Sequence, residues 1–199
     1  PIAVDVVPPT ITSVNSNKAN GSYSVGEVID IDVTFSEPVT SSGNVNVTLE
    51  TGATDRTCTF VVSSANTGTC NYTVQAGDIT SDLEVASISG TITDLDNNTM
   101  VNFVPVTNLA ANKAIVIDTV PLNISSVAVT PANNTAIVTW TTDKLSSSIV
   151  DFGFVPSLGN STAETDTTPR VMSHSVTMTG LGECAAYHFR ARSIDASGN

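Results

Sequence analysis

A phrase that occurs twice in this chain constrains its fold more than any other feature. Residues 3–14 read AVDVVPPTITSV, and residues 115–127 read IVIDTVPLNISSV. Each copy has a β-branched run, one Asp, a proline break and a new strand. This is how a chain leaves one β-sandwich and enters the next, so the repetition indicates a tandem array. We therefore expect the chain to open on the tail strand of a preceding domain.

The rest of the chain alternates apolar and polar residues with the period of β-strands. Ile29, Ile31, Val33 and Phe35 alternate with polar residues, and no stretch has a convincing helical period. Seven or so short strands in about 110 residues, separated by Asn- and Gly-rich turns, indicate an antiparallel sandwich. The predicted fold is all-β, with two tandem Ig-like or fibronectin III-like sandwiches. We expect a strand and linker over 1–8 and sandwiches over 9–120 and 121–199, the second lacking its last strand.

The net charge of the chain limits the classes of molecule that it is expected to bind. Nineteen acidic and seven basic residues give a net charge of −12, which disfavours nucleic acid and anionic lipid and favours cations. The alternative is an acidic surface that only keeps the protein soluble. The chain starts at Pro1, without a signal peptide or a spanning segment, so we expect a processed or excised piece of a larger precursor.

The three cysteines point to an oxidising compartment. Cys58 and Cys70 flank a turn centred on Ser64, and each shares its phase with the apolar residues of its own strand. Both thiols would then face each other across an antiparallel hairpin, so we predict a disulfide there. The alternative is two buried free thiols. Cys184, in a loop, is either a free thiol or a link to another molecule.

Particular phrases resemble two families. Residues 9–119 resemble a bacterial or archaeal Ig-like surface repeat, through YSVGEVIDI at 23–31, VTFSEPV at 33–39, YTVQAGD at 72–78 and NKAIVID at 112–118. Residues 121–199 resemble a fibronectin type III domain, through TWTTD at 139–143, VDFG at 150–153, SHSV at 173–176 and DASGN at 195–199. These families serve as spacers, stalks, adhesin modules and surface-layer building blocks. The first family usually has Asp-x-x-Gly-Asn after its sixth strand, where this chain has DLDNN at 94–98; Asn also holds a left-handed turn. Leu181 and Tyr187 have the spacing of a tyrosine corner.

The sequence does not favour catalysis. His174 and His188 are the only histidines, and neither has a Cys, His or carboxylate at metal-ligand spacing. No nucleophile elbow, zinc-protease motif, phosphate loop or dinucleotide fingerprint is present. We expect no enzymatic activity and no cofactor, with calcium as the one exception.

Calcium is the metal that the turns would suit, because it takes hard oxygen ligands gathered from several segments. If the sandwiches have the expected topology, one set forms at the domain junction and another at the start of the first domain. The first set is Asp118, Asp143 and Asp195, with Asn199 beside them, and the second is Asp5, Glu37, Asp94 and Asp96. The alternative is that Asp and Asn are only good turn residues.

Seven sequons are candidates for glycosylation, and we expect them in turns, at strand starts or on outward strand positions. They are Asn20, Asn46, Asn71, Asn97, Asn123, Asn133 and Asn160.

The leading interpretation is a non-catalytic module of an extracellular, cell-surface protein: a filament, stalk or adhesin segment. The alternatives are accessory domains of a secreted hydrolase, or a carbohydrate- or ligand-binding module, which sparse aromatic residues disfavour. Expected partners are other copies of the chain or neighbouring repeats of a longer one, without membrane insertion in this segment.

The surplus first strand and the missing last strand suggest one mode of assembly. A strand formed by residues 1–7, with Ile2, Val4 and Val6 facing inward, would complete the second sandwich of another copy and propagate head-to-tail. The alternative is that the chain was cut from a longer protein in which the seventh strand follows.

Overall fold

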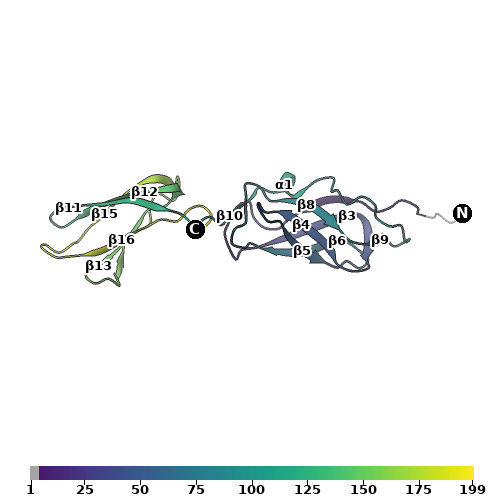
Figure 1. The fold of residues 1–199 in the computed structure, drawn as a ribbon, viewed down its shortest axis with the longest axis horizontal. Coiled ribbons are helices and arrows are strands. Elements are labelled where there is room, and N and C mark those ends of the chain that lie inside the picture. Colours follow the sequence, from purple (N-terminus) through teal and green to yellow (C-terminus); the bar gives the residue numbers. More distant parts are fainter. Residues whose placement is uncertain (1–4) are drawn as a thin grey trace. The chain divides into compact units, whose positions relative to one another are not determined.

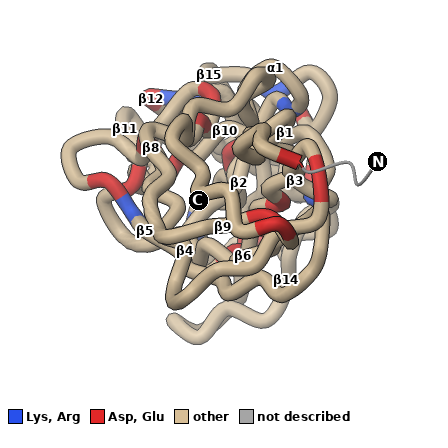
Figure 2. The backbone as a smooth tube through the Cα atoms, turned by 90° about the vertical axis from the view of Figure 1, so that its right-hand side faces the viewer, with Lys and Arg blue, Asp and Glu red and all other residues tan. Residues whose placement is uncertain are grey.

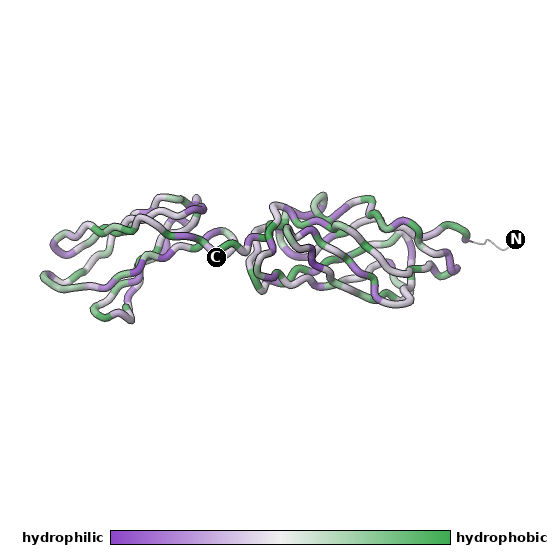
Figure 3. The backbone as a smooth tube through the Cα atoms, in the orientation of Figure 1, coloured by the Kyte–Doolittle hydropathy of each residue, from purple (hydrophilic) through white to green (hydrophobic). Residues whose placement is uncertain are grey.

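The computed structural model describes residues 5–199, which form two compact units with a boundary between Thr119 and Val120. Almost every element is a β-strand, which confirms the predicted all-β class (Figure 1). Apolar and polar positions alternate along the strands of both units (Figure 3).

The described part of the first unit contains ten strands and one short helix. They are β1 (Ile11–Asn15), β2 (Gly21–Tyr23), β3 (Val28–Ser41), β4 (Val45–Glu50), β5 (Arg56–Phe60), β6 (Ala65–Thr73), β7 (Ile79–Thr80), β8 (Glu84–Ser89), β9 (Ile92–Asp94), α1 (Leu109–Asn112) and β10 (Ile115–Asp118). One sheet has the order β1-β3-β6, with β9 added on the end of β3, and the facing sheet has the order β5-β4-β8. A small third sheet, β2-β10-β7, closes the unit.

The long strand β3 shows why these residues form this sandwich. Its residues Ile29, Ile31, Val33 and Phe35 are at most 2% exposed, and the residues between them are only partly buried, as the alternation predicts. The register of the β3–β6 pairing shifts between Thr34 and Val39. Beyond that point β3 pairs with β9 on the edge that β1 leaves, while Val39 still pairs with Ala65 of β6. One strand therefore supports both ends of the same sheet.

The disulfide joins Cys58 and Cys70, as predicted, but it does not staple a hairpin. Cys58 on β5 lies opposite Val47 of β4, and Cys70 on β6 lies opposite Ile31 of β3, so the two cysteines belong to different sheets. Strand alternation fixes the face of a side chain but not which strand is its neighbour. The bond therefore ties the two sheets together across the core.

Next to the disulfide, the two sheets approach closely at Gly68. A Cβ atom at this position would overlap the ring of Phe60, which lies two residues after Cys58. Glycine is required here by space and not by its backbone angles.

The described part of the second unit contains six strands. They are β11 (Ile124–Pro131), β12 (Ala136–Ser146), β13 (Ile149–Gly153), β14 (Asn160–Ser161), β15 (Val171–Met178) and β16 (His188–Arg192). They form two three-stranded sheets, β11-β12-β15 and β14-β13-β16 (Figure 1).

Trp140 of β12 is the centre of the second core. Its side chain is 2% exposed, its Nε1 donates a hydrogen bond to Ser193 Oγ at 2.9 Å, and its ring stacks on His174 with centroids 4.9 Å apart. The hydroxyl of Tyr187 accepts a hydrogen bond from the backbone N–H of Gly182 at 2.9 Å. This is the contact that the predicted tyrosine corner requires.

Candidate functional sites

Three of the predicted calcium ligands come together in the first unit. Asp5 precedes β1, Glu37 lies within β3 and Asp94 ends β9; one oxygen of each carboxylate lies within 4.8 Å of the others. The pairing of β9 with the end of β3 brings Asp94 to Glu37. Burial and then the charges of Asp5, Asp94 and Asp96 raise the pKa of Glu37. The fourth predicted ligand, Asp96, is exposed and outside this group.

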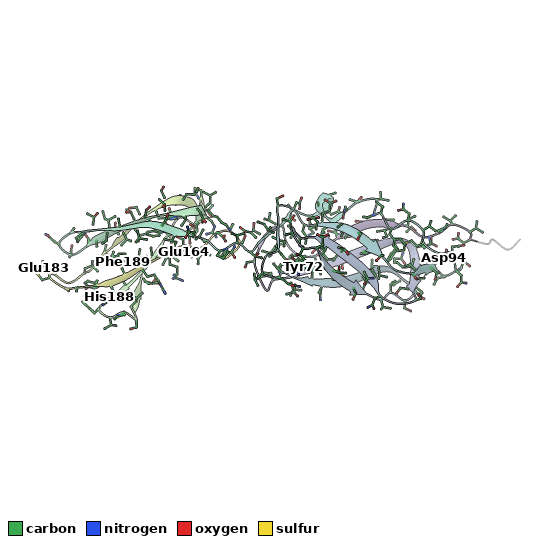
Figure 4. All side chains as sticks on the ribbon, in the orientation of Figure 1. Tyr72, Asp94, Glu164, Glu183, His188 and Phe189 are labelled. Carbon is green, nitrogen blue, oxygen red and sulfur yellow. A yellow bond between two sulfur atoms is a disulfide. The ribbon has the colours of Figure 1, made fainter. Side chains whose placement is uncertain are left out.

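Asp94 also organises its own loop, at the end of the first unit opposite Tyr72 (Figure 4). Its Oδ1 accepts hydrogen bonds from the backbone N–H groups of Asp96 and Asn98 at 2.9 and 2.7 Å, and its Oδ2 accepts one from Asn98 Nδ2 at 2.6 Å. Burial alone would raise the pKa of Asp94, but these hydrogen bonds outweigh it and hold the pKa below its usual value. Asn97 takes the left-handed conformation, with φ of 68°, as expected of its place in the motif.

The second unit repeats this loop bond for bond. Asp195 Oδ1 accepts hydrogen bonds from Ser197 and Asn199 N–H, and Asp195 Oδ2 accepts one from Asn199 Nδ2. Gly198 occupies the left-handed position, with φ of 90°. Burial opposes and the hydrogen bonds favour the charged form, so the pKa of Asp195 is also lowered, with a smaller contribution from Lys144. The two units therefore share one turn design.

The predicted junction set draws on both units. Asp118 ends β10 of the first unit, whereas Asp143 and Asp195 belong to the second. Asp143 Oδ1 accepts a hydrogen bond from Asn123 N–H at 2.9 Å. A calcium site formed by these three residues stays a prediction.

His174 lies in a polar network that the sequence did not predict. Its Nδ1 lies 2.7 Å from Ser148 Oγ, which also bonds to Asp166, and its Nε2 lies 2.8 Å from Thr142 Oγ1. The serine hydroxyl, and not the imidazole, bridges to the carboxylate, and His174 and Ser148 are 3% and 0% exposed. Burial lowers the pKa of His174, against an opposing effect of Asp166. The arrangement suits a neutral structural histidine; His188 is exposed on β16.

The first unit also contains a buried carboxylate that the sequence did not indicate. Asp78, 1% exposed, accepts hydrogen bonds from Arg56 Nε at 2.7 Å and from the Tyr72 hydroxyl at 2.8 Å. Burial, followed by Asp78, raises the pKa of Tyr72, so its hydroxyl stays protonated and donates. The phrase that carries the family resemblance at 72–78 contains both residues, and it gave no sign that Arg56 would reach them.

The second unit has an open groove of about 330 Å³ between its two sheets. Its apolar lining comes from both sheets and from the loop before β16, and includes Val129, Pro131, Met178, Leu181, Tyr187 and Phe189. Cys184, the exposed free cysteine, lies on the groove wall. Phe189 of the lining is labelled in Figure 4, as is Glu183, the neighbour of Cys184 in the chain.

The remaining predicted residues are those of the donor strand and of the sequons. Among the donor-strand residues, Ile2 and Val4 lie outside the described residues, and Val6 is 74% exposed. Asn46 is partly buried, and the remaining sequon residues are exposed: Asn20, Asn71, Asn97, Asn123, Asn133 and Asn160.

Acidic residues, red in Figure 2, outnumber basic ones nineteen to seven in the sequence. No helix of the described part is long and apolar enough to cross a membrane.

Comparison with known proteins adds little to this description. No protein-family model matches the chain, and no curated protein matches it. Among solved structures, it is similar to a DUF3823 family protein from Parabacteroides merdae ATCC 43184, with 10% identity over 96% of this chain and 83% of that chain. The TM-score is 0.18, which is too low to support an argument.

Proposed function

We propose that this chain is a non-catalytic structural or interaction module of an extracellular surface protein, such as a filament, stalk or adhesin segment. The observation that carries the proposal is the repeated construction. Each copy of the repeated phrase has a β-branched run, a proline and then a strand of its unit, and each unit contains the same Asp-to-Asn loop, formed by Asp94–Asn98 and Asp195–Asn199. Units built to one plan and joined by one phrase are typical of tandem arrays.

The family resemblances belong to this proposal. The second unit has two facing three-stranded sheets, a buried Trp140 on its second strand and a tyrosine corner at Tyr187. These features support a fibronectin type III-like domain. The two-sheet construction of the first unit supports an Ig-like repeat.

The disulfide supports the location. Structural disulfides persist in oxidising environments, so the Cys58–Cys70 bond indicates a protein that folds outside the cytoplasm. Placement at the cell surface goes further and rests on the resemblance to surface repeats.

A sugar-binding surface has less support. Such sites need exposed aromatic rings, whereas Trp140 is buried, and Phe154 is the one aromatic residue among the strongly exposed apolar residues of the described chain. Phe154 contacts Tyr187, with ring centroids 4.6 Å apart, so the pair does not extend into a row.

Antibody labelling of the cells that make the protein tests the proposal. We expect antibodies against the folded chain to label intact cells, and unreduced peptides from that material to contain the Cys58–Cys70 bond. Labelling that requires permeabilised cells would contradict the surface location. Turnover of peptides, glycosides or phosphoesters by the purified chain, if lost in His174→Ala or His188→Ala, would contradict a non-catalytic role.

A further inference from the structure

The closing strand of the first unit shows what completes such a sandwich. β10 runs parallel to β2 and antiparallel to β7, and its inward residues Ile115 and Ile117 are both 0% exposed. β10 thus fills the space between a strand that precedes β3 and a strand that precedes β8.

The groove of the second unit lies in the corresponding place. Four residues separate β2 from β3 (24–27), and four separate the end of β11 from β12 (132–135), so the end of β11 takes the position of β2. The opposite wall, from Leu181 to Tyr187, precedes β16 as β7 precedes β8. Within the described residues, β16 pairs only with β13, as β8 pairs only with β4, and no strand occupies the position that β10 takes between β2 and β7.

The sequence of this chain contains a segment that matches the strand needed. Residues 2–5 read IAVD and align with IVID of β10 at a constant offset, which also aligns Pro8 with Pro121 and Ile11 with Ile124. The segment continues into Val6 and Val7, which are 74% and 65% exposed. Ile2 and Val4, which correspond to the buried Ile115 and Ile117, lie outside the described residues.

We propose that residues 2–7 of a second copy of this chain bind in the groove as a β-strand, with Ile2 and Val4 in the positions that Ile115 and Ile117 occupy in the first unit. Added strands gain main-chain hydrogen bonds and place alternate side chains in the groove. Because donor and acceptor are different surfaces of one chain, the contact propagates head-to-tail. The inference rests on the proposed structural function and names its partner.

A peptide experiment tests this pairing in the full chain. The acceptor is the full chain carrying Ile2→Asp and Val4→Asp, which disables its own segment without touching the groove. Trp140, the single tryptophan, reports unfolding of the second unit alone. We expect a peptide of residues 1–9 to raise the midpoint of the Trp140 transition by at least about 5 °C at saturation, because a ligand of the folded state stabilises it.

The control is the same peptide carrying both Asp substitutions, which should leave the midpoint unchanged. Equal effects of the two peptides, or no effect of either, would overturn the proposal. Unaltered full chain should also form concentration-dependent linear oligomers by mass photometry, and the doubly substituted chain should not. If both chains stay monomeric, the groove is not filled by another copy. That result would leave the surface labelling and the non-catalytic role untouched, so the two failures are distinguishable.

Discussion

The two units share a plan and differ in how well it is completed. The first has twenty-four buried residues in its apolar core, a disulfide between its sheets and a closing strand, β10. The second has six such residues, no disulfide in its described residues and an open groove. Because apolar burial is the main stabilising term, we expect the first unit to unfold at the higher temperature.

The difference also extends to the kind of interaction used. The interior of the second unit contains the Ser148–His174–Thr142 hydrogen-bond network beside Trp140. In a purely apolar core, apolar side chains would occupy this place. A buried polar network stabilises only while every member is satisfied. The second unit should therefore be the more sensitive to changes that break single hydrogen bonds, and the first to changes in volume.

The largest predicted effect concerns volume in the first unit. Gly68→Ala places a methyl group where the Phe60 ring lies, so we expect a loss of about 3 kcal/mol or more in the free energy of unfolding of this unit. Gly43→Ala is the matched control, since a Cβ there meets no atom within 4 Å. Urea unfolding followed by circular dichroism measures both, and equal midpoints for the two variants would contradict the close inter-sheet contact.

Loss of the disulfide should reduce the free energy of unfolding of the first unit somewhat less than Gly68→Ala. Replacing Cys58 and Cys70 by Ala releases a link over a sequence separation of 12, which should cost about 2–3 kcal/mol. Cys184→Ala, which removes the exposed free thiol, should change nothing. The Trp140 transition should be the same in all three proteins, and a shift of that transition would show that the units are not independent.

Acid should weaken the second unit selectively. The pKa of His174 is lowered in the folded protein by burial and returns to about 6.5 on unfolding, so the unfolded chain binds more protons as the pH falls. The urea midpoint of the Trp140 transition should therefore decrease from pH 7.5 downward and level off below the folded pKa. His174→Gln should flatten this part of the profile, whereas His188→Gln, at an exposed position, should preserve it. A flat profile for the unaltered chain would contradict a buried neutral histidine.

The smallest predicted effect comes from the crowded carboxylates. Glu37→Gln removes one of three neighbouring charges and should stabilise the first unit by a few tenths of a kcal/mol at neutral pH. Because the pKa of Glu37 is raised, this advantage should disappear as the pH falls through the pKa and Glu37 becomes neutral. Asp55→Asn, at an exposed residue outside the cluster, is the control.

The calcium prediction has its own test. If the unfolding midpoints of both units are the same in EDTA and in millimolar calcium, the result counts against a calcium site.

Strand periodicity predicted the faces of the sheets well. The alternation correctly predicts that Ile29, Ile31, Val33 and Phe35 face inward. It also predicts that Cys58 and Cys70 face the core with the apolar residues of their strands. Alternation does not say which strands are neighbours, so it predicts a disulfide within a hairpin where the structure has one between sheets. Ser64, in the connection between β5 and β6, has a positive φ of 50°, which no sequence signal marks.

The polar sites were predicted unevenly for a related reason. The loop at Asp94 follows from a local motif, and its approach to Glu37 follows from topology. The His174 network includes Ser148 and Asp166, which come from segments that share no motif with His174. Arg56 and Asp78 likewise belong to separate segments without a common motif. Contacts fixed by local spacing are visible in one sequence, and contacts fixed by packing are not.

Cysteine trapping tests the central claim, that the groove of the second unit accepts residues 2–7 of another copy. Cys184 already lies on the groove wall, so cysteines introduced one at a time at Ala3, Val4, Asp5 and Val6 should form intermolecular disulfides with it. We expect a ladder of oligomers on non-reducing gels that is strongest at one or two of these positions and absent when Cys184 is replaced by Ser. Val101→Cys, at an 81% exposed residue, gives the background rate of trapping. Trapping no faster than that background at all four positions would contradict the account.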